Sequence, residues 1–275
     1  MSNAIFIVWR ESVEALLVIG ILQVWLNNRE QARMGLRFLW GGVAAGVGLA
    51  LLLAFIMLRV QTELAGAALE YFQIGMMLVA SALIIQMVFW MRRHGRTLKR
   101  KLEAGMEQAS SRANWWAVAA LATLAVGREG AETVIFLYGF GMSRTGLAQL
   151  QFFAATAAGL GLALCTYWLL SRGGRFFSWR TFFSCSEIVL LFLAAALLVD
   201  GVDRMIGLGW LPPLLDPVWD TSALLDDSSV AGSLVASLTG YRAHPALLVL
   251  LVYLAYWLLI TVFLRHSRPS QRKTA

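Results

Sequence analysis

The chain has 275 residues, of which 59% are hydrophobic and only 14% are charged, and its mean hydropathy is +0.68. This composition is too apolar for a soluble domain and is typical of a polytopic membrane protein. The net charge of +7 does not indicate a nucleic-acid-binding protein, because the basic residues lie in short segments between apolar runs. That pattern is typical of cytoplasmic loops, and the length allows one all-α bundle of about seven spans at ~20 residues each.

Seven apolar stretches follow one another along the chain and predict seven transmembrane helices. They cover residues 4–26, 38–58, 70–90, 115–140, 147–170, 181–199 and 245–264. The first stretch lacks a basic leader and is interrupted by charges, so we expect it to be a span and not a cleaved signal peptide. Cys165 and Cys185 both lie in apolar runs, where we expect two buried free thiols.

Lysine and arginine residues are distributed unevenly between the loops. Seventeen of the 23 follow the first, third and fifth stretches or lie in the C-terminal tail, two lie within stretches, and four remain for the opposite side. The positive-inside rule therefore places the N-terminus outside and the C-terminus in the cytoplasm. The acidic segment before the last stretch then faces the outside.

Two of the stretches carry nearly the same charged pentapeptide. The first copy is Arg10–Glu14 (RESVE) and the second is Arg128–Glu132 (REGAE). Because residues three and four apart share a helix face, each copy presents two carboxylates and one guanidinium on one side. A charge at mid-bilayer costs roughly 2.5 to 3.5 kcal/mol, so six such charges indicate a functional site. We expect the two motifs to face each other in a protein-lined, partly wet cavity.

The motifs belong to a longer internal repeat. At the offset of 118 residues that relates the motifs, Gly41 falls on Gly159, and Glu70 falls within one residue of Glu187. This predicts a duplicated three-helix unit, and a unit with an odd number of spans inserts upside down the second time. The predicted organisation of this single membrane domain is a first repeat (4–90), a basic cytoplasmic linker (91–114), a second repeat (115–199), an acidic extracytoplasmic loop (200–242), a seventh helix (243–264) and a cytoplasmic tail (265–275).

Two R-E-x-x-E motifs in the first and fourth of seven spans, with a long outer loop before the last, resemble the Ftr-type oxidase-dependent iron permeases. Residues 219–229, the pair Gly240-Tyr241, and Pro245 with Tyr253 are also similar to bacterial members. The resemblance covers nearly the whole chain. It implies import of ferric iron across the cytoplasmic (inner) membrane, with a periplasmic partner that delivers or oxidises the iron. It also implies that the motif residues carry out transport.

The chemistry of the motifs agrees with iron as the substrate. Ferric iron is a hard cation that prefers oxygen ligands, and four carboxylates on two facing helices supply them. Four glutamates and two arginines sum to a charge of −2 when all are ionised, which attracts a multivalent cation. We expect each arginine to hold its glutamate ionised and oriented in the empty site and to yield it when the metal arrives. The predicted metal ligands are Glu11, Glu14, Glu129 and Glu132, and their ion-pair partners are Arg10 and Arg128.

Acidic residues outside the motifs also have predicted roles. Glu70, near the outer end of its span, and Glu187, toward the inner end of its own, are interpreted as relays at which the cation arrives and leaves. The plainer interpretation is that each caps a helix or satisfies a neighbour. In the outer loop, Asp220, Asp226 and Asp227 are interpreted as collecting cations at the mouth of the site, and a solvated loop is the plainer alternative.

Other functions stay open at this stage. The transported cation is ferrous iron, manganese or lead in the first alternative, and the sequence does not distinguish them. A membrane-embedded enzyme or redox subunit is less well supported, since His94 and His266 lie in basic cytoplasmic segments. A structural subunit would not need six intramembrane charges. We therefore expect a transporter and not an enzyme, with the lipid bilayer and the iron ion as partners, no nucleic acid and no permanently bound cofactor.

Overall fold

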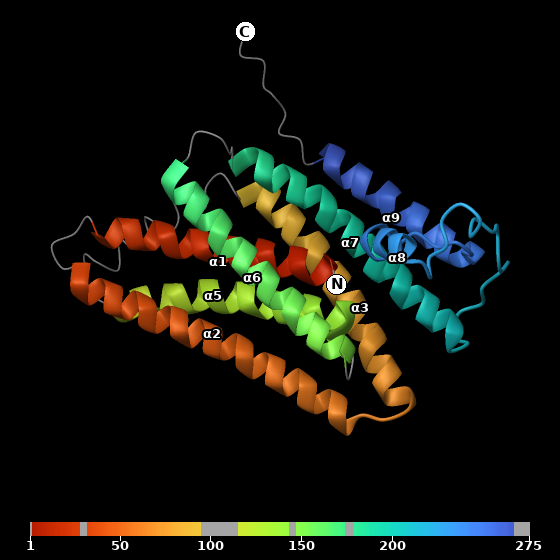
Figure 1. The fold of residues 1–275 in the computed structure, drawn as a ribbon, viewed down its shortest axis with the longest axis horizontal. Coiled ribbons are helices and arrows are strands. Elements are labelled where there is room, and N and C mark those ends of the chain that lie inside the picture. The colour runs from red at the N-terminus through yellow and green to blue at the C-terminus, as the bar shows by residue number, and fades with distance from the viewer. Residues whose placement is uncertain (1, 28–31, 95–114, 143–146, 174–178, 267–275) are drawn as a thin grey trace, which may run out of the picture. The chain divides into compact units, whose positions relative to one another are not determined.

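The computed structural model describes residues 2–27, 32–94, 115–142, 147–173 and 179–266. Within these ranges the chain is helical and contains no strand, which confirms the predicted all-α class (Figure 1). Most of the predicted linker (91–114) and tail (265–275) lies outside the described residues.

Each predicted span corresponds to one long helix. These helices are α1 (Ser2–Asn27), α2 (Ala32–Glu63), α3 (Ala67–His94), α5 (Trp115–Leu137), α6 (Leu147–Gly173), α7 (Trp179–Gly207) and α9 (Leu247–His266). Among the described residues, five of them (α2, α3, α6, α7 and α9) are long and apolar enough to cross a membrane, as expected of a polytopic membrane protein. The other two, α1 and α5, are of similar length but carry the charged motifs.

Two elements and one boundary differ from the predictions. A π-helix, η1 (Tyr138–Met142), continues α5, and a short helix, α8 (Val230–Thr239), lies within the segment predicted as an outer loop. That loop was also predicted to begin at residue 200, but α7 continues to Gly207. The apolar pattern marks only the part of a helix that lies in hydrocarbon, whereas the backbone hydrogen bonds continue into the polar interface.

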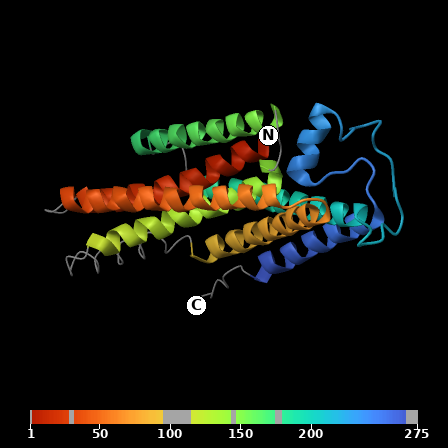
Figure 2. The same cartoon turned by 90° about the horizontal axis from the view of Figure 1, so that it is seen from below.

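The described helices divide into two compact units. The first consists of Met1–Met76 with Arg96–Ser186, and the second of Met77–Gly95 with Glu187–Ala275. In the first unit, α1 and α5 lie side by side and run in opposite directions, with α6 packed against α1 and α2 packed against α5 (Figures 1 and 2). The second helix of each predicted repeat therefore packs against the first helix of the other.

The contact between α2 and α5 depends on small residues. A Cβ atom added at Gly42 would lie 2.4 Å from the Ala119 carbonyl oxygen, and one at Gly46 would lie 2.9 Å from Val126 Cβ and 3.0 Å from the Thr123 carbonyl oxygen. The Thr123 hydroxyl also donates a hydrogen bond to the Gly42 carbonyl at 3.1 Å. The four-residue glycine spacing thus allows the close backbone approach that is typical of membrane helix pairs.

The contact between α6 and α1 repeats this arrangement. A Cβ added at Gly159 would lie 3.0 Å from Val8 Cβ and 2.6 Å from the Ile5 carbonyl oxygen. Val8 and Ile5 lie two and five positions before the first motif. Val126 and Thr123, which contact Gly46, lie two and five positions before the second motif. The contacts therefore pair Gly159 with Gly46, whereas the sequence offset paired it with Gly41, around which there is open space. The helical segments between the motif and this glycine are longer in the first repeat than in the second, which explains the shift.

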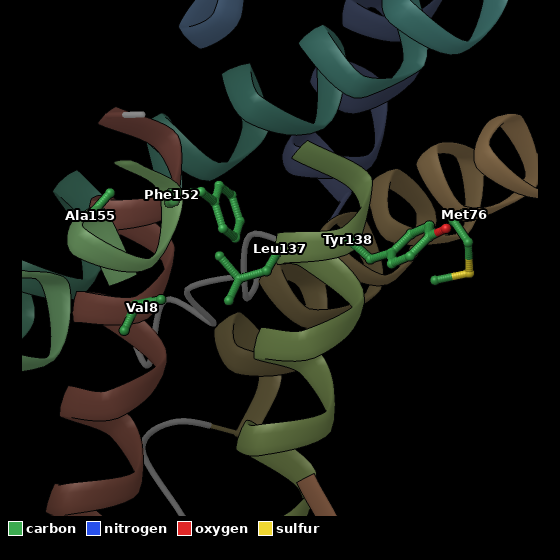
Figure 3. Packing of buried hydrophobic residues seen from close by; sticks show 7 residues of the cluster. Val8, Met76, Leu137, Tyr138, Phe152 and Ala155 are labelled. Atoms are coloured by element: carbon green, nitrogen blue, oxygen red, sulfur yellow. The ribbon is translucent and has the colours of Figure 1, made fainter. Parts of the chain in front are cut away.

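Two buried apolar clusters lie on either side of the motifs. The first apolar cluster joins the N-terminal end of α1 to the C-terminal end of α5 and consists of Ala4, Val8, Met76, Leu137, Tyr138, Phe152 and Ala155 (Figure 3). The second apolar cluster joins the opposite ends of the same helices and consists of Val18, Leu22, Leu26, Leu39, Val118 and Ala122. Because α1 and α5 are antiparallel, the charged residues between them are enclosed from both ends.

Both cysteines are free, as predicted, but the prediction that they are buried is wrong. Cys165 on α6 and Cys185 on α7 are exposed on the surface of the chain. In a membrane protein an apolar run faces lipid as readily as protein, so hydropathy alone does not indicate burial.

We predict that the α2–α5 contact is sensitive to side-chain volume at Gly46 and insensitive at Gly48. Gly46→Leu forces a side chain into the backbone of α5 and should destabilise the protein by roughly 1 to 3 kcal/mol. Gly48→Leu makes the same change where nothing lies within 4 Å of the added Cβ. Thermal unfolding of both variants in detergent tests this, and equal melting temperatures would contradict the packing described here.

Candidate metal centre

The structure brings the two charged motifs together between α1 and α5. Oxygen atoms of Glu11, Glu14 and Glu129 all lie within 4.8 Å of one another. Two oxygens on opposite sides of one cation, with bonds of roughly 2.0 to 2.4 Å, are about 4.0 to 4.8 Å apart. Three of the four predicted ligands are therefore close enough to bind a single ion.

The first motif is the more deeply buried of the two. The side chains of Arg10 and Glu11 are 1% and 0% exposed, and Arg10 Nη1 donates to Glu11 Oε1 at 2.8 Å. The other terminal nitrogen, Nη2, pairs with Glu14 one helical turn away. One guanidinium therefore orients both carboxylates of its motif, and its planar geometry suits this double role.

The second motif is more open. Arg128 is 40% exposed, and its Nε donates to Glu132 Oε1 at 2.8 Å, which fixes the fourth predicted ligand in an ion pair on its own helix. Glu129 extends instead toward the carboxylates of α1. The two arginines therefore differ: Arg10 neutralises the centre of the site, and Arg128 lies toward its edge.

Several carboxylate oxygens in the site have no partner. The Oε2 atoms of Glu11, Glu129 and Glu132 are buried and lack a hydrogen bond from any described residue. A buried anionic oxygen without a donor is strongly disfavoured, and in native proteins such atoms usually mark a bound ion, an ordered water or a functional strain. The donor set and its unpartnered oxygens therefore suit a cation that prefers oxygen ligands.

The glycine within the second motif determines how closely α2 approaches the site. A Cβ added at Gly130 would lie 2.5 Å from Ala50 Cβ on α2, so a larger residue would push α2 away. Thr133 follows in the same turn, and its hydroxyl donates to the Glu129 carbonyl at 2.7 Å. On α1, Trp9 Nε1 donates to Thr166 Oγ1 on α6 at 2.9 Å, which fixes the helix beside Arg10. Sequence reasoning did not identify these supporting residues.

The two predicted relay residues lie elsewhere. Glu70 is exposed in the first turn of α3. Glu187 forms an ion pair with Arg92 within the second unit, which is the satisfied-neighbour alternative considered from the sequence. Neither belongs to the group of carboxylates found between α1 and α5.

The predicted cation-collecting aspartates are bonded within their own loop. Asp220 accepts hydrogen bonds from the Ser222 hydroxyl at 2.6 Å and the Ser222 amide at 2.9 Å, and these bonds hold its pKa below the usual value. Asp226 accepts from the Ser228 amide at 2.8 Å, which lowers its pKa in the same way. Asp227 Oδ2 accepts from the Ala243 amide at 3.4 Å. All three carboxylates help to shape the loop.

Further contacts join the two sides of this loop. Thr221 Oγ1 and Tyr241 Oη are 2.6 Å apart, and Tyr241 donates to the Leu225 carbonyl at 2.9 Å. His244 Nε2 lies 3.0 Å from Asp220 Oδ1. The segment between α7 and α9 is thus a structured loop and not an extended acidic chain.

We predict that removing Arg10 destabilises the protein far more than removing Arg128. Arg10→Met leaves two buried carboxylates without their counter-charge, which typically costs roughly 3 to 5 kcal/mol. Arg128→Met breaks a single, partly solvated ion pair, so the loss of stability should be smaller. Thermal unfolding of the purified variants measures both, and equal losses would show that the two motifs are buried alike.

We also predict that the loop loosens only in acid. A carboxylate whose pKa is lowered by folding stabilises the fold above its ordinary pKa, and this contribution is lost as the pH falls through the lowered value. Amide hydrogen exchange at Ser222 and Ser228, corrected for intrinsic rates, should therefore be constant until the pH falls below about 3.9, the ordinary aspartate pKa, and should then increase. Asp220→Asn should remove this transition at Ser222 only, and unchanged protection across the transition would contradict the proposed bonds.

Comparison with known proteins identifies the chain's relatives. The Iron permease FTR1 family matches residues 1–267. The protein named ferrous iron permease EfeU from Escherichia coli O6:H1 (strain CFT073) is 29% identical over 257 residues, which cover 91% of this chain and 90% of the relative. The proteins of the same name from Shigella sonnei (strain Ss046) and Yersinia pestis are 29% and 27% identical, over 91% of this chain and 90% and 88% of theirs.

No solved structure matches the chain. The family and these relatives are permeases, so the protein is a transporter for iron and not an enzyme, and its apolar helices place it in a membrane as a multi-pass protein. The match extends over both motifs and nearly every described helix. The chain belongs to the Iron permease FTR1 family.

Proposed function

We propose that this permease imports iron across the cytoplasmic membrane through a site formed by the glutamates of its two motifs. The observation that carries the proposal is the group of three carboxylates from α1 and α5 whose oxygens lie within 4.8 Å of one another. Their unpartnered buried oxygens are available as ligands for a cation. Glu132 joins the site as the fourth ligand when it leaves Arg128.

We propose ferrous iron as the transported ion. The four glutamates and two arginines sum to −2 when ionised, so a divalent ion makes the enclosed site neutral and a trivalent ion leaves it positive. Neutrality matters here because uncompensated charge is costly away from water. The relatives' names point the same way. The ferric ion, expected from the hardness of carboxylate ligands, is the alternative that the uptake assay below separates.

Release from the site needs a competitor for the carboxylates, and the arginines provide it. Arg10 already contacts Glu11 and Glu14, and Arg128 contacts Glu132. When the ion leaves, these guanidinium groups reclaim their partners and compensate half of the four negative charges in the empty site. The exchange of an ion for an ion pair keeps the two states close in free energy, as transport requires.

The first unit is built for access from alternate sides. One apolar cluster closes the N-terminal end of α1 and a second closes its C-terminal end, with the motifs between them. The matched contacts of Gly46 and Gly159 support a pair of inverted three-helix repeats, an architecture in which one half rocks against the other. With the N-terminus outside and the C-terminus in the cytoplasm, the first apolar cluster is the outer seal and the second is the inner seal.

The remaining residues take secondary roles in this proposal. Glu70, exposed at the start of α3, is suited to meet the arriving ion, and Glu187 with Arg92 to meet the departing one. The loop aspartates Asp220, Asp226 and Asp227 add negative potential at the outer surface. A periplasmic protein that delivers or oxidises iron is the expected partner at this surface.

We predict that removing one negative charge from the site abolishes uptake. Glu14→Gln and Glu129→Gln keep the size of the side chain but weaken charge and metal binding. Each should reduce iron uptake by about a hundredfold, the upper end of the loss typical of removing a residue that only supports a metal ligand. Glu63→Gln, at the exposed end of α2, is the matched control. Radiolabelled iron uptake into proteoliposomes provides the measurement, with thermal unfolding as a check on folding.

The same assay distinguishes the substrates. Uptake under reducing conditions and not with a ferric chelate supports ferrous iron, and the reverse result supports ferric iron. Efficient competition by manganese or lead would favour the alternative of a less selective cation transporter. Normal uptake by both motif variants would remove the carboxylates from the transport path.

A further inference from the structure

One polar atom lies unexplained within the first apolar cluster. Tyr138 is 2% exposed, and its buried hydroxyl has no hydrogen-bond partner among the described residues. A tyrosine hydroxyl almost always finds a partner when it is buried, since leaving it unpaired costs free energy that a phenylalanine would avoid. Tyr138 is also the only member of this cluster whose side chain carries an oxygen. Packing therefore explains the ring but not the hydroxyl.

The backbone at this position is unusual as well. Tyr138 begins the π-helix η1, directly after α5. Such turns are rare and are often found at functional sites. Figure 3 shows that Leu137 and Tyr138 point to different sides: Leu137 toward Val8 and Phe152, and Tyr138 toward Met76 on α3. The Tyr138 ring also packs edge-on against Phe72, with ring centroids 5.4 Å apart.

The position of the hydroxyl along the helices is between the outer surface and the site. Tyr138, the first residue of η1, follows Glu132 on α5 by six residues, which is about 9 Å at the helical rise of roughly 1.5 Å per residue. Its neighbour Met76 follows Glu70 by six residues on α3, a similar distance from the exposed start of that helix. The hydroxyl therefore lies about midway between Glu70 and the motif carboxylates, where the apolar cluster closes the path.

We propose that the Tyr138 hydroxyl is a transit ligand for the cation at the outer seal. The inference rests on the proposed function, because it assumes that ions reach the motif glutamates past this cluster. An ion that crosses an apolar seal loses part of its hydration shell, and a phenol oxygen replaces one water during the passage. The hydroxyl has no partner among the described residues, so none of them competes with the arriving ion. The ligand class is a hard or borderline metal cation, partly hydrated, that prefers oxygen.

The test is Tyr138→Phe, which removes the oxygen and keeps the ring against Phe72 and Met76. Because the lost hydroxyl was unpaired, the melting temperature should stay the same or rise. Equilibrium iron binding by the purified protein should be unchanged, since the motif glutamates remain. The initial rate of uptake into proteoliposomes should fall by roughly tenfold, the effect of one lost interaction with a charged group.

Tyr256→Phe is the matched control. Tyr256 is also a buried tyrosine, but its hydroxyl donates to the Leu191 carbonyl at 2.7 Å, within the second unit. This variant should lower the melting temperature and leave uptake per folded molecule unchanged. The two variants make the same chemical change, so opposite effects on stability and transport separate a role in transit from a role in packing.

Three results would overturn the proposal. Uptake by Tyr138→Phe at the wild-type rate would show that the oxygen is not used, and a lower melting temperature that accounts for the lost uptake would show a structural role. Loss of equilibrium iron binding would place Tyr138 in the metal site itself. Failure of the proposed function has a different signature: Glu129→Gln would then bind and transport iron normally, whatever the result for Tyr138→Phe.

Discussion

The burial of like charges beside one guanidinium is the constraint that shapes the first unit. Glu11, Glu14 and Glu129 are close enough to repel one another strongly in an apolar surrounding, and Arg10 is the cation at their centre. Such a group is tolerable only if the helices that carry it are held firmly and if a substrate can complete its charge. The fold meets the first condition through packing, and in the proposed function the iron ion meets the second.

Two kinds of packing hold this group: small residues at the helix contacts and apolar clusters at both ends of the motifs. Glycines at the α2–α5 and α6–α1 contacts bring backbones together, where dispersion and not the hydrophobic effect supplies the attraction between helices in lipid. The clusters above and below the motifs exclude water and so strengthen every electrostatic interaction between them. The close helix contacts and the two apolar clusters thus hold the same group of charges in place.

The sequence predicted the helices and the position of the charged motifs, because charges are energetically costly in a membrane. Charges in apolar runs are expensive, so their position identified the site, and hydropathy identified the helices that carry it. It did not predict which apolar residues form the seals, because Leu137 and Leu124 look alike in hydropathy although one is buried and the other faces outward. For the same reason Cys165 and Cys185 were wrongly expected to be buried. The contacts of Gly159 could not be read from a fixed offset, because the helices between the motif and this glycine differ in length between the repeats.

The exchange of helices between the two halves has a consequence for biogenesis. Helices α1 and α2 leave the ribosome long before α5 and α6, yet α2 packs on α5, and α1 packs on both α5 and α6. Until translation has passed Gly173, the first motif must reside in the bilayer without its final neighbours. Its internal ion pairs, Arg10 with Glu11 and Glu14, reduce its net charge from −2 to −1 during that interval. These ion pairs therefore lower the cost of holding α1 in the bilayer before α5 and α6 are made.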